Sequence, residues 1–158
     1  CGLENCIYLG NLDSERDWGH AKDYVEMQWL MLQQDRPEDF VIATGRKVKI
    51  RTFAELAAKK LGWGDSVNTP SIIWEGDGLN EIGRRGDTNK IVIRIDPRYF
   101  RPTEVDQLLG DASKAQKKLG WSPKTNLEEI VDEMIINDLN QSKKEIILSN
   151  ADFESKKS

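Results

Sequence analysis

Residues 16–45 have the sequence RDWGHAKDYVEMQWLMLQQDRPEDFVIATG, and this stretch decides the fold class of the chain. Apolar side chains recur at every third or fourth position between Trp18 and Gln34, which predicts an amphipathic helix that ends before Pro37. Residues 39–43 (DFVIA) are a short apolar run and predict a buried strand after the helix. The stripe predicted to be buried on the helix consists of Ala21, Tyr24, Val25, Trp29 and Leu32.

The segments on either side extend this alternation of strand and helix. Residues 7–9 (IYL) predict a strand, and residues 10–17 (GNLDSERD) predict a loop. Thr52 and Glu55 match a capping box for a second helix, which ends at Gly62. The order strand, helix, strand, helix predicts an α/β fold with parallel strands, because a parallel pair needs a crossover helix between its strands. The apolar side chains of the second helix are Phe53, Leu56, Ala57 and Leu61.

The next stretch predicts a hairpin with a long tip. Residues 71–75 (SIIWE) and 90–95 (KIVIRI) are strand-like, and residues 76–89 between them are rich in glycine and charge. The sequence from Gly76 approaches the G-x-G-x-x-G turn that binds a dinucleotide, but Glu81 stands where the third glycine belongs. No helix is predicted after it, so we do not expect a dinucleotide site here.

Two helices are predicted in the C-terminal part. Asp111 is placed to cap a short helix that runs through Leu119 and ends at Gly120. Asn126 and Glu129 match a further capping arrangement, followed by the most regular apolar stripe in the sequence. This stripe consists of Leu127, Ile130, Val131, Met134, Ile135 and Leu139.

Beyond Gln141 the sequence becomes rich in serine, lysine and asparagine. This composition predicts that the helix frays, and that residues 145–158 form a disordered tail.

Composition argues against two classes of partner. The chain has 158 residues, 38% of them hydrophobic, which is enough for a folded core. Its 23 basic and 27 acidic residues give a net charge of −4, which repels a nucleic-acid backbone. The longest apolar runs, such as 91–93 and 146–148, are far shorter than the ~20 residues that span a bilayer. Cys1 and Cys6 support neither a disulfide framework nor a zinc site, so we expect a cytoplasmic protein without nucleic-acid or membrane partners.

Arg16 is a candidate for binding a diphosphate. It lies in the predicted loop before a helix, and the amide groups at a helix N-terminus favour negative charge. The alternative is a solvated arginine, or an internal salt bridge to Asp17 or Asp23.

Arg101 and Glu104 form a second candidate pair, with Pro102 stiffening the backbone between them. A guanidinium fork can hold a phosphate through two hydrogen bonds, and a carboxylate can accept hydrogen bonds from ribose hydroxyls. The alternative is a surface ion pair.

The residues that would start a proton or hydride transfer are not found by the sequence patterns. His20 is the only histidine, and at the start of a helix we expect it to form a structural hydrogen bond. The fourth residue after Tyr8, Tyr24 and Tyr99 is not lysine, so the tyrosine and lysine pair of short-chain dehydrogenases is missing. No catalytic residue is therefore assigned to this chain.

Three stretches together resemble the GDP-mannose 4,6-dehydratases, an extended short-chain dehydrogenase family: residues 16–45, quoted above, IIWEGDGLNEIGR at 72–84, and DPRYFRPTEVDQLLGDASKAQKKLGW at 96–121. The resemblance covers the chain up to about Lys144. It implies the C-terminal part of an NAD(P)-binding Rossmann-like fold with its smaller α/β substrate lobe. Residues 1–46 would supply the last elements of the Rossmann-like domain, and residues 47–144 would form the lobe for the nucleotide sugar.

The resemblance also implies an activity for a full-length chain. The family converts GDP-mannose to GDP-4-keto-6-deoxy-mannose, the first step towards GDP-fucose. NADP takes a hydride from sugar C4, water leaves across C5 and C6, and the hydride returns to C6. By the same resemblance, Arg16 and Arg101 lie at the GDP diphosphate and Glu104 near the ribose.

The resemblance implies that NADP and the catalytic residues belong to a segment before Cys1, so the isolated chain is expected to be inactive. Homo-oligomers, dimers or tetramers, are expected of the full-length enzyme.

Two alternatives remain open at this stage. Another extended short-chain dehydrogenase-type epimerase or reductase would share Arg16 but not the RYFRPTEVD run at 99–107. A non-catalytic nucleotide-sugar-binding module would lack any Rossmann segment before Cys1, a residue that is not an initiator methionine.

Overall fold

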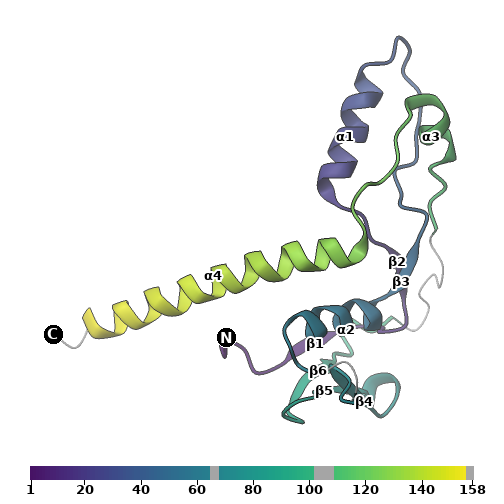
Figure 1. Ribbon diagram of the computed structural model, residues 1–158. Coiled ribbons are helices and arrows are strands. Elements are labelled where there is room, and N and C mark those ends of the chain that lie inside the picture. Colours follow the sequence, from purple (N-terminus) through teal and green to yellow (C-terminus); the bar gives the residue numbers. More distant parts are fainter. Residues whose placement is uncertain (65–67, 102–108, 156–158) are drawn as a thin grey trace.

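A computed structural model of the chain describes residues 1–64, 68–101 and 109–155. The chain forms two lobes that are joined by a two-stranded ribbon, and one long helix projects away from the junction (Figure 1). The strands are β1 (Ile7–Leu9), β2 (Glu15–Asp17), β3 (Lys47–Lys49), β4 (Ile72–Glu75), β5 (Ile82–Arg85) and β6 (Ile91–Ile95). The helices are α1 (Ala21–Leu32), α2 (Ile50–Lys60), α3 (Ser113–Leu119) and α4 (Leu127–Ser155), with a short 3₁₀ helix η1 (Gly78–Asn80).

The first lobe contains a four-stranded sheet in the order β1-β6-β5-β4. β1 is parallel to β6, as the α/β prediction requires, and the other pairs are antiparallel. The predicted two-stranded hairpin is wrong, because β5 forms within its supposed tip and lies between β4 and β6. A Cβ atom on Gly83 would come within 3.2 Å of both Ile72 and Ile93. The glycine therefore lets these side chains pack closely against the sheet.

α2 covers this sheet with a small core of Ala58, Ile72 and Ile93. The predicted capping box is wrong, because α2 begins at Ile50 and Thr52 lies inside it. Glu55 instead accepts a hydrogen bond of 2.7 Å from Trp74 Nε1. The predicted end of the helix is confirmed, since Gly62 follows α2 with a positive φ of 73°.

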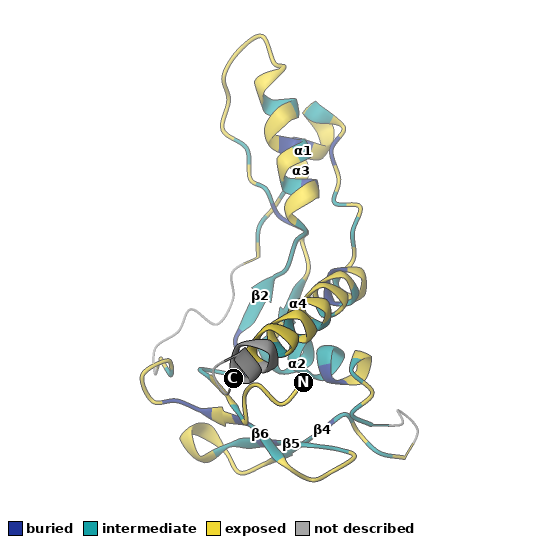
Figure 2. Ribbon diagram, turned by 90° about the vertical axis from the view of Figure 1, so that its left-hand side faces the viewer, coloured by how far each residue is buried: buried dark blue, intermediate teal, exposed yellow. Residues whose placement is uncertain are grey.

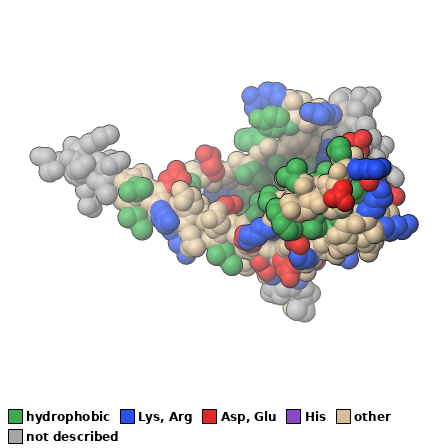
Figure 3. Space-filling model, turned by 90° about the horizontal axis from the view of Figure 1, so that it is seen from above, with side chains coloured by type: hydrophobic (Ala, Val, Ile, Leu, Met, Phe, Trp, Pro, Cys, Tyr) green, Lys and Arg blue, Asp and Glu red, His purple; other side chains and the backbone are tan. Residues whose placement is uncertain are grey.

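The second lobe packs α1 against α3 around Met27, Ala115 and Trp121. The predicted stripe of α1 is largely wrong: Val25, Trp29 and Leu32 are exposed, whereas Asp23 and Met27 are buried. Seen from above, hydrophobic side chains gather over this lobe (Figure 3). The helix therefore has a second apolar face that the described residues leave uncovered.

Residues 39–43, predicted as a strand, form no strand here. Phe40 and Ile42 pack against the α1 core, as alternating side chains of a strand would. A strand exists only through hydrogen bonds to a neighbouring strand, and within the described ranges this segment has no such neighbour.

α4 begins with the predicted capping pair. Asn126 Oδ1 accepts from Glu129 N at 2.9 Å, and Glu129 Oε2 accepts from Asn126 N at 2.8 Å. Ile130 and Val131 are buried, but most of the helix is exposed (Figure 2). The predicted disordered tail is wrong as far as Ser155, because the lysine and glutamate residues after Gln141 are good helix formers and α4 continues unbroken.

No helix among the described residues carries an apolar stretch long enough to cross a bilayer.

Candidate functional site

Arg16 lies in strand β2, not in the loop predicted for it. β2 pairs antiparallel with β3, and Arg16 is directly opposite Val48. The guanidinium is half-buried and donates a hydrogen bond of 2.9 Å from Nη1 to the carbonyl of Glu15. The ribbon between the two lobes therefore holds this candidate diphosphate ligand.

Asp17 fixes the ribbon to the end of the segment that follows α1. Its carboxylate accepts hydrogen bonds from the Thr44 hydroxyl at 2.6 Å and from the backbone N–H groups of Thr44 and Gly45, each at 2.9 Å. Asp17 was one of the carboxylates that the alternative interpretation paired with Arg16. Its carboxylate contacts Thr44 and Gly45 in this structure.

Arg101 lies at the end of the segment after β6, and its side chain is exposed. Its backbone is held by one side chain from the loop after β1: Asn11 Oδ1 accepts from Arg101 N at 2.8 Å, and Asn11 Nδ2 donates to Arg101 O at 2.8 Å. The loop that leads to Arg16 is thereby joined to Arg101. Glu104, the third candidate, lies outside the described residues.

The turn before Arg101 is organised by Asp96, which is buried. Its carboxylate accepts hydrogen bonds from the Arg98 side chain, the shortest at 2.7 Å, and from Arg98 N at 2.8 Å. These contacts, the side-chain one first, hold the pKa of Asp96 below its usual value. The Asp96 carbonyl also accepts from Tyr99 N and Phe100 N, so the backbone leading to Arg101 is fully organised.

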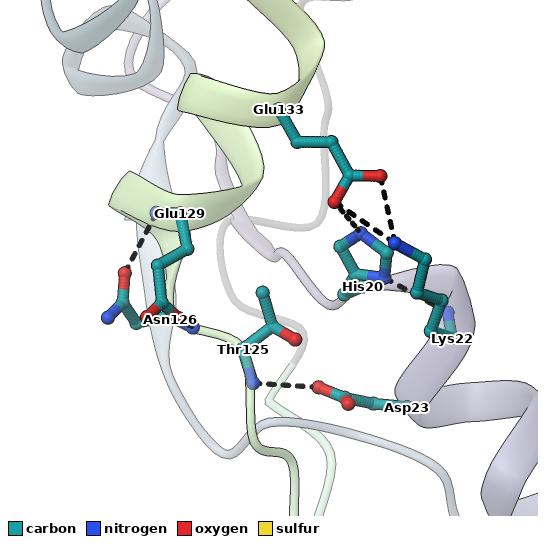
Figure 4. Close-up of polar contacts among 7 residues, drawn as sticks. All are labelled: His20, Lys22, Asp23, Thr125, Asn126, Glu129 and Glu133. Atoms are coloured by element: carbon teal, nitrogen blue, oxygen red, sulfur yellow. Dashed lines mark hydrogen bonds and ion pairs between the residues drawn. The ribbon is translucent and has the colours of Figure 1, made fainter.

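His20 forms structural hydrogen bonds, as predicted (Figure 4). Nδ1 accepts from Lys22 N at 3.0 Å and so caps α1, while Nε2 lies 3.2 Å from Glu133 Oε2 on α4. The cap requires an unprotonated Nδ1, which places a proton on Nε2. Lys22 Nζ lies 3.0 Å from Glu133 and lowers the pKa of that carboxyl. An imidazole therefore already satisfies one of the N-terminal amides of α1.

Asp23 is a buried carboxylate that sequence patterns did not identify. It accepts a hydrogen bond from Thr125 N at 2.9 Å (Figure 4). A second hydrogen bond comes from Lys124 N at 3.0 Å. Burial opposes the ionisation of Asp23, but these backbone hydrogen bonds outweigh it and lower the pKa. Asp23 therefore joins α1 to the start of α4.

Arg51 on α2 braces the loop between Asn11 and Arg16. Its guanidinium contacts Asp13 at 3.1 Å, pairs with Glu81 and lies 4.7 Å from the ring centre of Trp74. The hydrogen bond to Glu81 raises the pKa of Arg51 most, and the hydrogen bond to Asp13 raises it further. The loop is thus tied to both the helix and the sheet of the first lobe.

Two hollows are present beside these residues. One of about 550 Å³ lies between the ribbon and the start of α4, and its lining includes Trp18, Arg46 and Lys124 but neither Arg16 nor Arg101. Another of about 510 Å³ is mostly apolar and is lined by residues 1–7, α2 and β6. Among the described side chains, no group of three His, Cys, Asp or Glu residues is placed to hold a metal ion.

The segment from Gly76 to Glu81 does not fit a dinucleotide. The Gly76 to Gly78 turn leads into a 3₁₀ helix of three residues, and Glu81, which follows, is engaged by Arg51. A dinucleotide site needs a full helix whose N-terminus faces the pyrophosphate. The structure is consistent with the prediction that residues 76–81 do not form a dinucleotide-binding turn.

Solved structures share this arrangement at low sequence identity. RMD from Pseudomonas aeruginosa, solved with NADPH, matches 85% of the chain and 36% of its own length, with a TM-score of 0.59 and 18% identity. UDP-glucose 4-epimerase from Thermotoga maritima, solved with UDP-glucose, matches 87% of the chain and 36% of its own length, with a TM-score of 0.60 and 22% identity. The chain therefore shares the Rossmann-like α/β fold of these structures, over about a third of their length.

Sequence comparison gives the family. The profile of the GDP-mannose 4,6 dehydratase family matches residues 1–134, and the chain belongs to this family. GDP-mannose 4,6-dehydratase from Yersinia enterocolitica is 49% identical over an alignment of 163 positions, which covers 97% of this chain and 42% of that protein. The human GDP-mannose 4,6 dehydratase is 50% identical over 138 residues, or 87% of this chain and 35% of that protein. The chain thus spans about two-fifths of these relatives.

Proposed function

We propose that the protein carrying this chain is a GDP-mannose 4,6-dehydratase, and that the two lobes described here bind its nucleotide sugar. The relatives that bear this name are about half identical to the chain over most of its length. The observation that carries the binding role is the link between Arg16 and Arg101, since Asn11 joins the loop that leads to one arginine to the backbone of the other. Two guanidinium groups suit a diphosphate, which offers several acceptor oxygens.

NADP is the proposed cofactor, and we assign it to a part of the protein other than the described residues. Two features of the second lobe support a role for residues 1–46 in completing a Rossmann sheet. Residues 39–43 have strand-like packing without a neighbouring strand, and α1 has an uncovered apolar face at Val25, Trp29 and Leu32. A sheet edge added at this place would satisfy both. Residues 47–144 then build most of the substrate lobe, while α3 returns to pack against α1 and β1 pairs with β6.

The same resemblance supports a cytoplasmic homo-oligomer, a dimer or a tetramer, that provides the first step towards GDP-fucose.

The deciding experiment is to incubate the purified protein, in its natural full length, with GDP-mannose and NADP and to analyse the products by mass spectrometry. Loss of one water with formation of a 4-keto sugar is expected. An epimerised sugar nucleotide without loss of water would favour the epimerase alternative. Binding of GDP-mannose without any product would favour a non-catalytic nucleotide-sugar module.

A separate experiment addresses the 158-residue chain. The same incubation with this chain alone should give no product, because NADP is assigned to another part of the protein and no catalytic base is assigned in this sequence. Turnover by the pure chain would contradict the assignment of the cofactor to another segment.

A further inference from the structure

We infer that Asn11 is a positioning residue for the nucleotide diphosphate, acting through the backbone of Arg101. This inference rests on the proposed function and adds a residue to it. The amide of Asn11 binds both the N–H and the C=O of Arg101, each at 2.8 Å, across 90 positions of sequence. A side-chain amide that pairs with both groups of one residue fixes that residue in position and in orientation.

Close backbone contact beside Asn11 supports the same role. A Cβ atom on Gly10 would lie 2.4 Å from the carbonyl oxygen of Tyr99, a distance that no side chain tolerates. Gly10 therefore permits the approach of the two segments, and Asn11 fixes their relative position. Because Asp96 organises the other end of the turn, the backbone of Arg101 is held from both sides.

The loop that carries Asn11 is itself rigid. Leu12 is buried, and its carbonyl accepts from Arg51 N at 2.9 Å, while the carbonyl of Ser14 accepts from Ile50 N at 3.1 Å. The ribbon strand with Arg16 follows directly. Asn11 thereby fixes the backbone of Arg101 relative to the strand that carries Arg16. Two cations that are already held at the right spacing bind one diphosphate more tightly, because less conformational entropy is lost on binding.

A residue that only stabilised the fold would give the same hydrogen bonds, so the experiment must separate the two roles. Asn11→Ala, Arg101→Ala and the double variant are made in the protein at its natural full length, and GDP is titrated by calorimetry. Asn11→Ala is expected to weaken GDP binding about 5- to 10-fold, the loss that corresponds to one or two neutral hydrogen bonds. In the Arg101→Ala background the same change should cost less than about 2-fold, because a positioning residue has nothing left to position.

Asn126→Ala is the matched control. It removes an asparagine that also accepts a backbone N–H at 2.9 Å, but at the start of α4. It should lower the midpoint of thermal unfolding about as much as Asn11→Ala does, and leave GDP affinity unchanged.

The titrations test the proposed site and the role of Asn11 separately. If Arg101→Ala itself leaves GDP binding intact, the proposed site is wrong. If Arg101→Ala weakens binding and Asn11→Ala does not, the site stands and the role of Asn11 is refuted. Equal losses from Asn11→Ala in both backgrounds would also refute it, since they would show that Asn11 acts independently of Arg101.

Discussion

Trp121 Nε1 donates a hydrogen bond of 2.9 Å to the backbone carbonyl of Asp23, 98 positions earlier in the sequence. Both residues are buried, and the indole also belongs to the core that joins α1 to α3. One side chain thus provides both the apolar contact and the polar contact that hold the second lobe together.

Trp121→Ala is therefore expected to destabilise the 158-residue chain by about 3 to 5 kcal/mol, because it opens a cavity and leaves a buried carbonyl without its donor. Urea unfolding followed by circular dichroism measures the change. Trp29→Ala is the matched control, since Trp29 is 59% exposed and its loss should cost less than about 1 kcal/mol. Similar losses from both variants would contradict the assignment of the core.

Asp23 should make the stability of the chain depend on pH. Its pKa in the folded state is held below the ordinary value of 3.8, so it stabilises the fold above that pH. This contribution is lost as the pH falls below the ordinary value and through the folded value. Asp23→Asn should be less stable than the parent near neutral pH, and the difference should shrink as the pH approaches about 3.

Urea midpoints measured at several pH values between about 3 and 7 provide the test. The difference between parent and variant isolates Asp23 from the other carboxylates with lowered pKa values, such as Asp96 and Glu133. A difference that stays constant with pH would show that Asp23 is not linked to folding through its ionisation.

Local signals in the sequence predicted the start of α4 and the ends of α2 and α3. Asn126 with Glu129, and Gly62 and Gly120 with their positive φ values, act within a few residues, so the pattern contains the whole cause. The buried face of α1 was not predictable in this way. Its side chains offer two apolar faces, and only the position of α3 selects the one at Met27.

Arg16 and Arg101 were proposed from the sequence because guanidinium groups are suited to phosphate, and their role stays a proposal. The contacts that hold them in place could not be predicted. Asn11 gives no such signal, because its partner lies 90 positions away. The ribbon that carries Arg16 was missed for the same reason, since β2 is a strand only through its pairing with β3.

Arg51 should be a main source of stability in the first lobe. Arg51→Met keeps the apolar stem but leaves Glu81, whose side chain is only 12% exposed, without its cation. We expect a loss of about 2 to 3 kcal/mol in urea unfolding. The control is Asp13→Ala: this carboxylate is 63% exposed, and its loss should cost less than about 1 kcal/mol. If Asp13→Ala lowered the free energy of unfolding more than Arg51→Met did, the pair of Arg51 with Glu81 would not be the main source of stability.

The uncovered face of α1 should make the 158-residue chain self-associate. Val25 and Leu32 are 60% and 81% exposed, and contiguous exposed apolar side chains promote association. Val25→Lys with Leu32→Lys should shift the chain towards monomer in light scattering, with little change in its unfolding midpoint. If the proposed Rossmann sheet covers this face, the same pair should destabilise the protein at its natural full length. A full-length protein that tolerates both lysines would contradict that placement.

Arg16 provides the direct test of the diphosphate site. Loss of a charge-assisted contact to phosphate costs about 1.5 to 3 kcal/mol, so Arg16→Ala should weaken GDP binding by roughly 10- to 150-fold in calorimetric titration. NADP affinity should not change, because the cofactor is assigned to another segment. Arg101→Lys should recover part of the affinity lost in Arg101→Ala, because lysine keeps the charge but lacks the planar fork.

The control for Arg16→Ala is Lys49→Ala, which removes a neighbouring cation of the ribbon that is paired with Asp13. If the Arg16→Ala protein remains folded and binds GDP as tightly as the parent and the Lys49→Ala control do, then Arg16 is a structural residue of the ribbon and the diphosphate must bind elsewhere.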